Sequence, residues 1–184
     1  MQVLSHFFRQ RELTARIEAS RQRLYRVALS WSHDPSLADD LTQESLTKAL
    51  KKLAQLKDPA TLESWLFSIL TNCWRDHFRA LRPAEDIADF EESIFIPEDT
   101  PEHIHGNSQM VQRVRDAVAR LPIGQRQVLT LVDLEEFSYG EAAAILNIPI
   151  GTVMSRLCRA RQQLKDYLSD LQHHRTEPRL RRVK

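Results

Sequence analysis

The chain has 184 residues, of which 42% are hydrophobic and 28% charged, and its formal net charge is +1. The hydrophobic share excludes a wholly disordered protein, and no apolar run reaches the about 18 residues that a membrane span needs. Four glycines and short β-branched runs favour helices over sheets, and the eight prolines fall between periodic segments. We therefore expect an all-α fold.

The cysteines and the N-terminal segment indicate a cytoplasmic protein. Cys73 and Cys158 lie far apart, without a CxxC or Cys/His spacing, so reduced thiols are expected rather than a disulfide or a metal site. Arg9 and Arg11 interrupt the first apolar patch, which leaves no signal-peptide core. We expect no membrane insertion.

The first part of the chain begins with two helical patterns. The first covers residues 12–31, with apolar positions along one side. Asp34-Pro35 then has the form of an N-cap followed by proline at the first helical position, which predicts a helix to about Leu53. One side of this second helix is apolar, and the other is expected to be an exposed stripe of Asp40, Gln43, Glu44 and Thr47.

A third pattern, residues 61–81, has very regular apolar spacing. Trp65 lies at the edge of its apolar side, and Ser68, Asn72, Arg75 and Arg79 lie just beyond. An aromatic ring beside a polar and basic strip can stack on unpaired bases and hold them. A tryptophan at helical spacing can also be part of a hydrophobic core, so base stacking and core packing both stay open for Trp65.

An acidic segment, residues 84–107, follows Pro83 and contains no lysine or arginine. The net charge of +1 therefore hides a basic remainder, which suggests a polyanionic partner. We predict a flexible linker here, which either has a purpose of its own or is simply a soluble spacer. Its acidic residues are Glu85, Asp86, Asp89, Glu91, Glu92, Glu98, Asp99 and Glu102.

Beyond the linker, the apolar period predicts four more helices, which form a second small domain. They cover residues 110–121, a segment after Pro122, residues 139–146 and residues 151–168. The last two are joined by Asn147-Ile148-Pro149 and have the proportions of a helix-turn-helix. The inward side of the last helix is predicted to consist of Val153, Leu157, Ala160 and Leu164.

The outward side of the last helix carries Thr152, Ser155, Arg156, Arg159 and Gln163. Arginines contact guanine edges or phosphates, and small hydroxyls allow close approach to a DNA groove. Backbone amides near Thr152 are expected to be available to a phosphate, and Arg156 and Arg161, nearer the margins, are expected to contact phosphates too. The alternative is a solvated basic face, which the preceding turn makes the weaker interpretation.

Several motifs occur in a fixed order along the chain. They are ADDLTQESLTKA (residues 38–49), SWLFSI (64–69) with Asn72 and Asp76-His77, FSYGEAA (137–143), IPIGTV (148–153), SRL (155–157) and RAR (159–161). Together they resemble regions 2 and 4 of the extracytoplasmic-function (ECF) sigma factors of bacterial RNA polymerase. The similarity covers roughly residues 20–82 and 108–168.

The resemblance implies a sigma factor that binds core RNA polymerase at the β′ clamp and the β flap and directs promoter recognition, DNA melting and initiation. It also implies regulation by an anti-sigma factor. Asp40, Gln43 and Glu44 would contact the β′ clamp. Trp65, Asn72, Arg75 and Arg79 would contact the −10 element, where a flipped base is captured, and Thr152, Ser155, Arg156, Arg159 and Arg161 the −35 element.

The same resemblance divides the chain into region 2 (residues 1–83), the acidic linker (84–107), region 4 (108–170) and a basic tail (171–184). The sequence departs from the family at Met154, where many members have a basic residue, and at Cys158, where many have an aromatic one. Asp58-Pro59 also replaces the usual glycine-containing loop. The promoter sequence therefore cannot be transferred from the family.

Two other classes of protein are alternatives to this interpretation. A helix-turn-helix regulator that acts without core polymerase would not explain the stripe at Asp40 or the acidic segment. An enzyme is disfavoured because the sequence has no Ser/His/Asp arrangement, phosphate-binding glycine loop or metal-ligand spacing, so we expect no cofactor, metal or small-molecule substrate. His103, His105, His173 and His174 are expected to be solvated, with metal sensing as the alternative.

Overall fold

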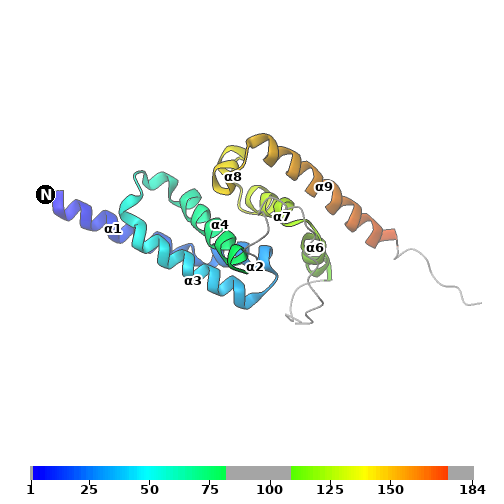
Figure 1. Cartoon of the computed structure of the whole chain (residues 1–184), viewed down its shortest axis with the longest axis horizontal. Coiled ribbons are helices and arrows are strands. Elements are labelled where there is room, and N and C mark those ends of the chain that lie inside the picture. Colours follow the sequence, from blue (N-terminus) through cyan, green and yellow to red (C-terminus); the bar gives the residue numbers. More distant parts are fainter. Residues whose placement is uncertain (1, 82–108, 174–184) are drawn as a thin grey trace, which may run out of the picture.

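The computed structural model describes residues 2–81 and 109–173, and these segments form helices and short connections with no strand among them (Figure 1). The predicted all-α class is confirmed. The first group comprises α1 (Gln2–Ala19), α2 (Arg21–Ser32), α3 (Pro35–Lys52), the 3₁₀ turns η1 (Leu53–Gln55) and η2 (Pro59–Thr61), and α4 (Leu62–Leu81). The second comprises α6 (Gln109–Ala119), α7 (Ile123–Leu129), the π-helical turn η3 (Thr130–Leu134), α8 (Tyr139–Leu146) and α9 (Ile150–His173).

Three predictions lie partly or wholly outside the described residues. The acidic segment 84–107 is one of them, together with His103 and His105. The basic tail lies outside them beyond residue 173, and so does His174.

The prediction of one helix over residues 12–31 is wrong, because the helix is divided at Ser20 into α1 and α2. The Ser20 hydroxyl donates to the carbonyl of Arg16 at 2.9 Å. The Ser20 amide is shared between the carbonyls of Arg16 and Ile17, at 3.1 and 3.2 Å, so the last turn of α1 is tightened there. Ile17 and Leu24 are nevertheless both buried, so the apolar period continues across the break.

The start of α3 agrees with the sequence. Asp34 is extended and its carboxylate accepts hydrogen bonds from the amides of Ser36 and Leu37 at 2.8 and 3.2 Å, with Pro35 at the first helical position. These bonds satisfy two of the amides that a helix start leaves without partners. The helix ends at Lys52, close to the expected Leu53.

The core of the first group lies between α2, α3 and α4. Trp31 of α2 and Trp74 of α4 meet edge to face with ring centroids 5.8 Å apart. The buried hydroxyls of Thr42, Ser45 and Thr71 donate to carbonyls one turn earlier, at 2.6, 2.6 and 2.9 Å. Because these hydrogen bonds offset the cost of removing the hydroxyls from water, the three residues can lie among apolar side chains.

The two groups of helices pack directly against each other and share one continuous hydrophobic core. Phe67 of α4 meets Phe137, which follows η3, at a centroid distance of 5.0 Å. The hydroxyls of Ser30 in α2 and Thr130 in η3 are 3.1 Å apart. The side chain of Arg126 in α7 is fully buried and donates to the Trp31 carbonyl at 2.8 Å.

His33, at the end of α2, makes the stability of this packing depend on pH. Burial disfavours the charged imidazolium, and Arg126 repels it, so the pKa of His33 is lowered to about 4. In the unfolded chain a histidine takes up a proton near pH 6.5. The contribution of neutral His33 to stability is therefore complete above about pH 6.5 and is lost progressively as the pH falls from there towards 4.

We expect the variant His33→Asn to have a flatter stability profile between pH 7 and pH 4.5 than the wild type, measured by urea unfolding at several pH values. Asparagine tolerates the left-handed backbone of this position, where φ is 54°. Other titrating groups act equally in both proteins, so the difference between the two profiles reports on residue 33. Parallel profiles would contradict the assignment.

Candidate nucleic-acid interface

The outer side of α3 presents Asp40, Gln43, Glu44 and Thr47, all exposed as the spacing predicts. The Gln43 amide donates to Asp39 at 2.8 Å, and Glu44 forms an ion pair with Lys48 at 2.9 Å. The hydrogen bond with Glu44 raises the pKa of Lys48 despite its partial burial. The stripe is therefore an ordered acidic and polar surface, accessible to a partner.

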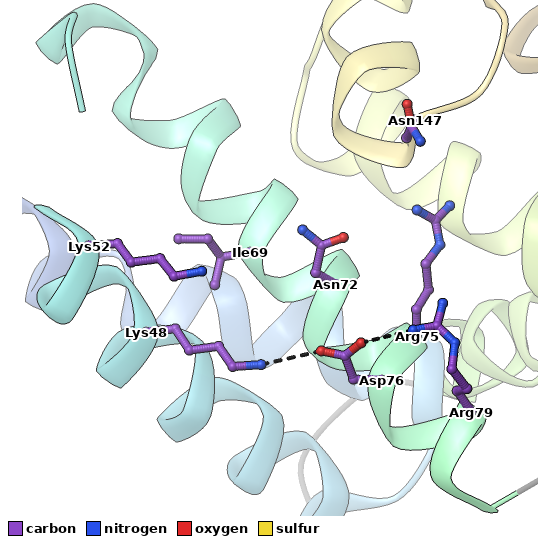
Figure 2. A pocket seen from close by; sticks show the side chains of 8 residues that line it. All are labelled: Lys48, Lys52, Ile69, Asn72, Arg75, Asp76, Arg79 and Asn147. Atoms are coloured by element: carbon purple, nitrogen blue, oxygen red, sulfur yellow. Dashed lines mark hydrogen bonds and ion pairs between the residues drawn. The ribbon is translucent and has the colours of Figure 1, made fainter. Parts of the chain in front are cut away.

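A cavity of about 450 Å³ opens beside α4 (Figure 2). Asn72, Arg75 and Arg79, on successive turns of α4, all line it. The other lining residues are Lys48 and Lys52 of α3, Ile69 and Asp76 of α4, and Asn147 after α8. With four cations and one carboxylate along its wall, the cavity suits an anionic ligand such as a nucleic-acid backbone.

Sequence reasoning missed the two lysines of this cavity. Lys48 and Lys52 are one turn apart on α3, and a spacing of four residues would have placed them on one side of that helix. Only the packing of α3 against α4 shows that this side faces Asn72. In Figure 2, Lys48 and Asp76 are joined across the two helices, at a distance of 3.4 Å.

Trp65 is not among the residues that line the cavity. Its side chain is half-buried and packs against the hydrophobic core. The structure therefore supports the core role that the sequence left open for this residue, and stacking of a base on its exposed surface stays a prediction.

Two arginines of the cavity bind other groups of the protein. Arg75 donates to the carbonyl of Leu146, the last residue of α8, at 2.5 Å. Figure 2 shows its side chain extending from α4 towards Asn147. A cation at this end of a helix is favoured, because the carbonyls there carry partial negative charge. Arg79 pairs with Asp76 at 3.4 Å.

The helices α8 and α9 form the predicted helix-turn-helix. Ser138 caps α8: its hydroxyl accepts from the Glu141 amide at 3.3 Å, and its own amide donates to the Glu141 carboxylate at 2.9 Å. The hydroxyl and the amide of Ser138 together lower the pKa of Glu141. Asn147 ends α8 in the left-handed conformation, with φ 48°, which turns the chain into α9.

The two sides of α9 agree with the sequence. Val153, Leu157 and Ala160 are buried and Leu164 is half-buried, whereas Ser155 and Arg159 are exposed and Thr152 is half-exposed. The Thr152 amide itself is not one of the free amides expected near the start of this helix. This amide donates to the Pro149 carbonyl at 2.9 Å, because α9 begins one residue earlier than predicted, at Ile150.

Arg156 and Arg161, both expected at the margin, contact the rest of the second group. The guanidinium of Arg156 lies over Gly124 of α7, so that a β-carbon at Gly124 would come within 2.9 Å of Cζ. Arg161 binds both oxygens of Asp133 in η3, at 2.6 and 3.1 Å, and these bonds raise its pKa. No short-range pattern predicts either contact, since residues 124 and 156, like residues 133 and 161, are far apart along the chain.

Membrane spans, metal-ligand clusters and cysteines were the other features that the sequence raised. No helix in segments 2–81 and 109–173 is long and apolar enough to cross a membrane. Within the same segments, no group of three or more His, Cys, Asp or Glu side chains is placed to hold a metal ion. Cys73 is buried and Cys158 exposed, and both are free thiols, as the spacing predicts.

Comparison with known proteins agrees with this geometry. Residues 16–83 match the family model of sigma-70 region 2, and residues 111–164 match that of sigma-70 region 4. The chain is 35% identical to the ECF RNA polymerase sigma factor EcfG of Rhodopseudomonas palustris over 152 residues, which cover 83% of this chain and 82% of EcfG. It is 36% identical over 149 residues to the ECF sigma factor SigE of Mycolicibacterium smegmatis, of which it spans 58%.

Among solved structures, the sigma factor RpoE of Bartonella quintana, in complex with the anti-sigma factor NepR, superimposes with a TM-score of 0.71. The sequence identity is 28%, and the alignment covers 86% of this chain and 97% of the other. The structure of CnrH in complex with the cytosolic domain of CnrY has a TM-score of 0.57 at 25% identity. The matches to both regions, in order along one chain, show that this protein belongs to the ECF sigma factors of bacterial RNA polymerase.

Proposed function

We propose that this chain binds the β′ clamp and the β flap of core RNA polymerase, directs the polymerase to promoters and helps to melt the DNA. It works in the cytoplasm and catalyses no reaction itself. Residues 1–83 act as region 2, residues 84–107 as a linker, residues 108–170 as region 4, and residues 171–184 as a basic tail. The observation that carries the proposal is the two-sided helix α9, whose buried side fixes the direction of an exposed side that carries Ser155 and Arg159.

The three candidate surfaces have complementary tasks in this proposal. The stripe of Asp40, Gln43 and Glu44 binds the polymerase, and the cationic wall with Asn72 binds the −10 element. The outer side of α9 reads the −35 element in the major groove. This division gives separate tasks to the acidic stripe of α3 and to the cationic wall between α3 and α4, in a chain with a net charge near zero.

We also propose that an anti-sigma factor controls the chain. Two solved relatives are each bound to a partner: the sigma factor RpoE is bound to the anti-sigma factor NepR, and CnrH is bound to the cytosolic domain of CnrY. Such a partner would have to cover at least one of the three surfaces to prevent initiation.

In vitro transcription tests the proposal. The purified chain with core polymerase should give specific transcripts from a genomic promoter library, whereas core polymerase alone should not. A helix-turn-helix regulator would bind DNA without giving such transcripts and without binding core polymerase in a pull-down. The absence of specific transcripts, or the absence of binding to core polymerase, would contradict the proposal.

The variant Asn72→Ala should impair open-complex formation on duplex promoters much more than on a promoter already open at the −10 element. Extruding a base from the stack costs a few kcal/mol, and a pocket that binds the extruded base supplies this energy. Permanganate footprinting on both templates measures the difference. Asn72 is exposed, so its loss should leave the fold intact, and equal defects on both templates would argue against the pocket.

The variant Arg159→Ala should relax the base preference at one position of the −35 element. Arg159 projects outward from the middle of α9, where its guanidinium can bind O6 and N7 of a guanine, a contact that contributes about 1–3 kcal/mol of discrimination. The measurement is binding to single-base variants of the element at two salt concentrations. A uniform loss of affinity across all variants would instead indicate a phosphate contact.

The matched comparison is Arg161→Ala, which removes another exposed cation of α9. Arg161 lies nearer the margin of the helix, so this change should weaken all DNA sequences alike and flatten the salt dependence. It also breaks the ion pair with Asp133. Its unfolding curve should therefore be recorded beside the binding data.

A further inference from the structure

The exposed face of α9 extends further round the helix than the outward side that the sequence predicts. Arg156 and Gln163, both on the predicted side, are half-buried. Met154 and Cys158, which lie on the other flank of Ser155, are exposed. With about 3.6 residues per turn, Ser155 lies near the middle of the exposed face, and Met154 and Cys158 belong to that face as well.

This flank of α9 is apolar at three successive turns. Ile150, Met154 and Cys158 are spaced by four residues, so they lie one above another along the helix. Ile150 is 52% exposed and Met154 is 53% exposed, which places them among the most exposed large hydrophobic side chains of the described segments. None of the three belongs to the hydrophobic core that the described residues form. We call these three residues the apolar edge.

The surroundings of the apolar edge suit DNA. A β-carbon at Gly151 would meet nothing within 4 Å, so the first turn of α9 is open to close approach. The small side chain of Ser155 is exposed in the next turn, and Arg159 adds an exposed cation on the other flank. Small residues beside a cation match the base edges and the phosphates of a major groove. Charge complementarity therefore favours DNA over an apolar protein surface as the occupant.

Apolar side chains in a major groove can select one base. The edges of guanine, cytosine and adenine present hydrogen-bond donors and acceptors there, whereas thymine adds a 5-methyl group. An apolar side chain placed against a polar edge displaces water without replacing its hydrogen bonds, which lowers affinity. Against a thymine methyl group it buries apolar surface instead, which raises affinity.

We propose that Ile150, Met154 and Cys158 form a second reading edge of α9, which selects thymine in the −35 element by contact with its 5-methyl group. The inference rests on the proposed function and adds a specificity beside the guanine contact of Arg159. The apolar edge lies in the N-terminal half of α9, the part of a recognition helix that reaches base edges. Its length of roughly 12 Å, at about 1.5 Å per residue, matches roughly three to four base pairs at about 3.4 Å each.

Replacing thymine by deoxyuridine tests the proposal, because this change removes the 5-methyl group and nothing else. The full chain is bound to core polymerase, and its affinity is measured for a promoter found by the in vitro transcription described above. Each thymine of the −35 element, on both strands, is replaced in turn. We expect the wild type to lose about three- to fourfold in affinity at one position or more, the effect of burying one methyl group.

The variant Met154→Ala should bind the thymine and deoxyuridine forms of one such position equally, because its side chain no longer reaches the methyl group. Met154→Leu supplies another apolar side chain and should restore the difference. Lys165→Ala changes another exposed residue of α9, and it should keep the full difference at every position. Because Met154 is exposed, the unfolding curves of its two variants should match that of the wild type.

The outcomes separate this proposal from the proposed function. Equal binding of the thymine and deoxyuridine forms by the wild type, an undiminished difference for Met154→Ala, or a −35 element without A·T pairs would overturn the thymine contact and leave the sigma-factor role intact. Weaker binding of Met154→Ala to core polymerase without DNA would assign the apolar edge to a protein partner and overturn it too. If the wild type with core polymerase bound and transcribed no promoter, the proposed function would fail, and the thymine contact with it.

Discussion

Arg126→Ala is expected to lower the free energy of unfolding by about 3 kcal/mol or more, which is a large fraction of the stability of a typical small protein. The substitution leaves the carbonyls of Trp31, Ala119 and Leu121 without their donor, and each unsatisfied buried group costs about 1–3 kcal/mol. It also leaves a cavity where a fully buried side chain stood. Urea unfolding followed by circular dichroism measures the change.

Arg126→Met separates these effects. Methionine fills much of the volume and removes a cation whose pKa burial has lowered to about 10, so its cost should be smaller than that of alanine. An exposed arginine of the same domain, Arg159, serves as the control: Arg159→Ala should change stability by no more than about 0.5 kcal/mol. An equally small change for Arg126→Ala would show that the buried network does not stabilise the fold.

The double variant Asp40→Arg with Glu44→Arg is expected to weaken binding to core polymerase by about 100-fold or more. Like charges that meet across an interface cost several kcal/mol, and both positions are exposed on one side of α3. Because no buried group changes, the unfolding curve should stay close to that of the wild type. Fluorescence titration of labelled chain with core polymerase gives the dissociation constant.

The control for this prediction makes the same charge change on another helix. Glu12 and Glu18 of α1 are exposed, and Glu12→Arg with Glu18→Arg shifts the net charge of the chain by the same amount. We expect this variant to bind core polymerase almost normally. A loss as large as that of the α3 variant would indicate a general charge effect and contradict the assignment of the stripe.

Much of the local structure was predictable because it depends on residues close together in sequence. Asp34 determines the start of α3 through bonds to the amides of Ser36 and Leu37, and Pro35 stands at the first helical position. Ser138 and Asn147 do the same for the two ends of α8. The inward and outward sides of α9 follow from a helical period that three buried residues make clear. The apolar period was less reliable at Ser20, where a single turn residue divides a helix that the period makes continuous.

The sequence by itself therefore determined the helices, their exposed stripes and the family to which the chain belongs, since each is encoded in short-range spacing. Only the tertiary structure decided which stripes meet. It brought Lys48 and Lys52 to the cavity at Asn72, tied Arg161 to Asp133 and buried Arg126 against Trp31. A hydrogen bond between residues 95 positions apart has no periodic signature, because its geometry exists only after two sets of helices have packed. The packing of the first group of helices against the second is of this kind.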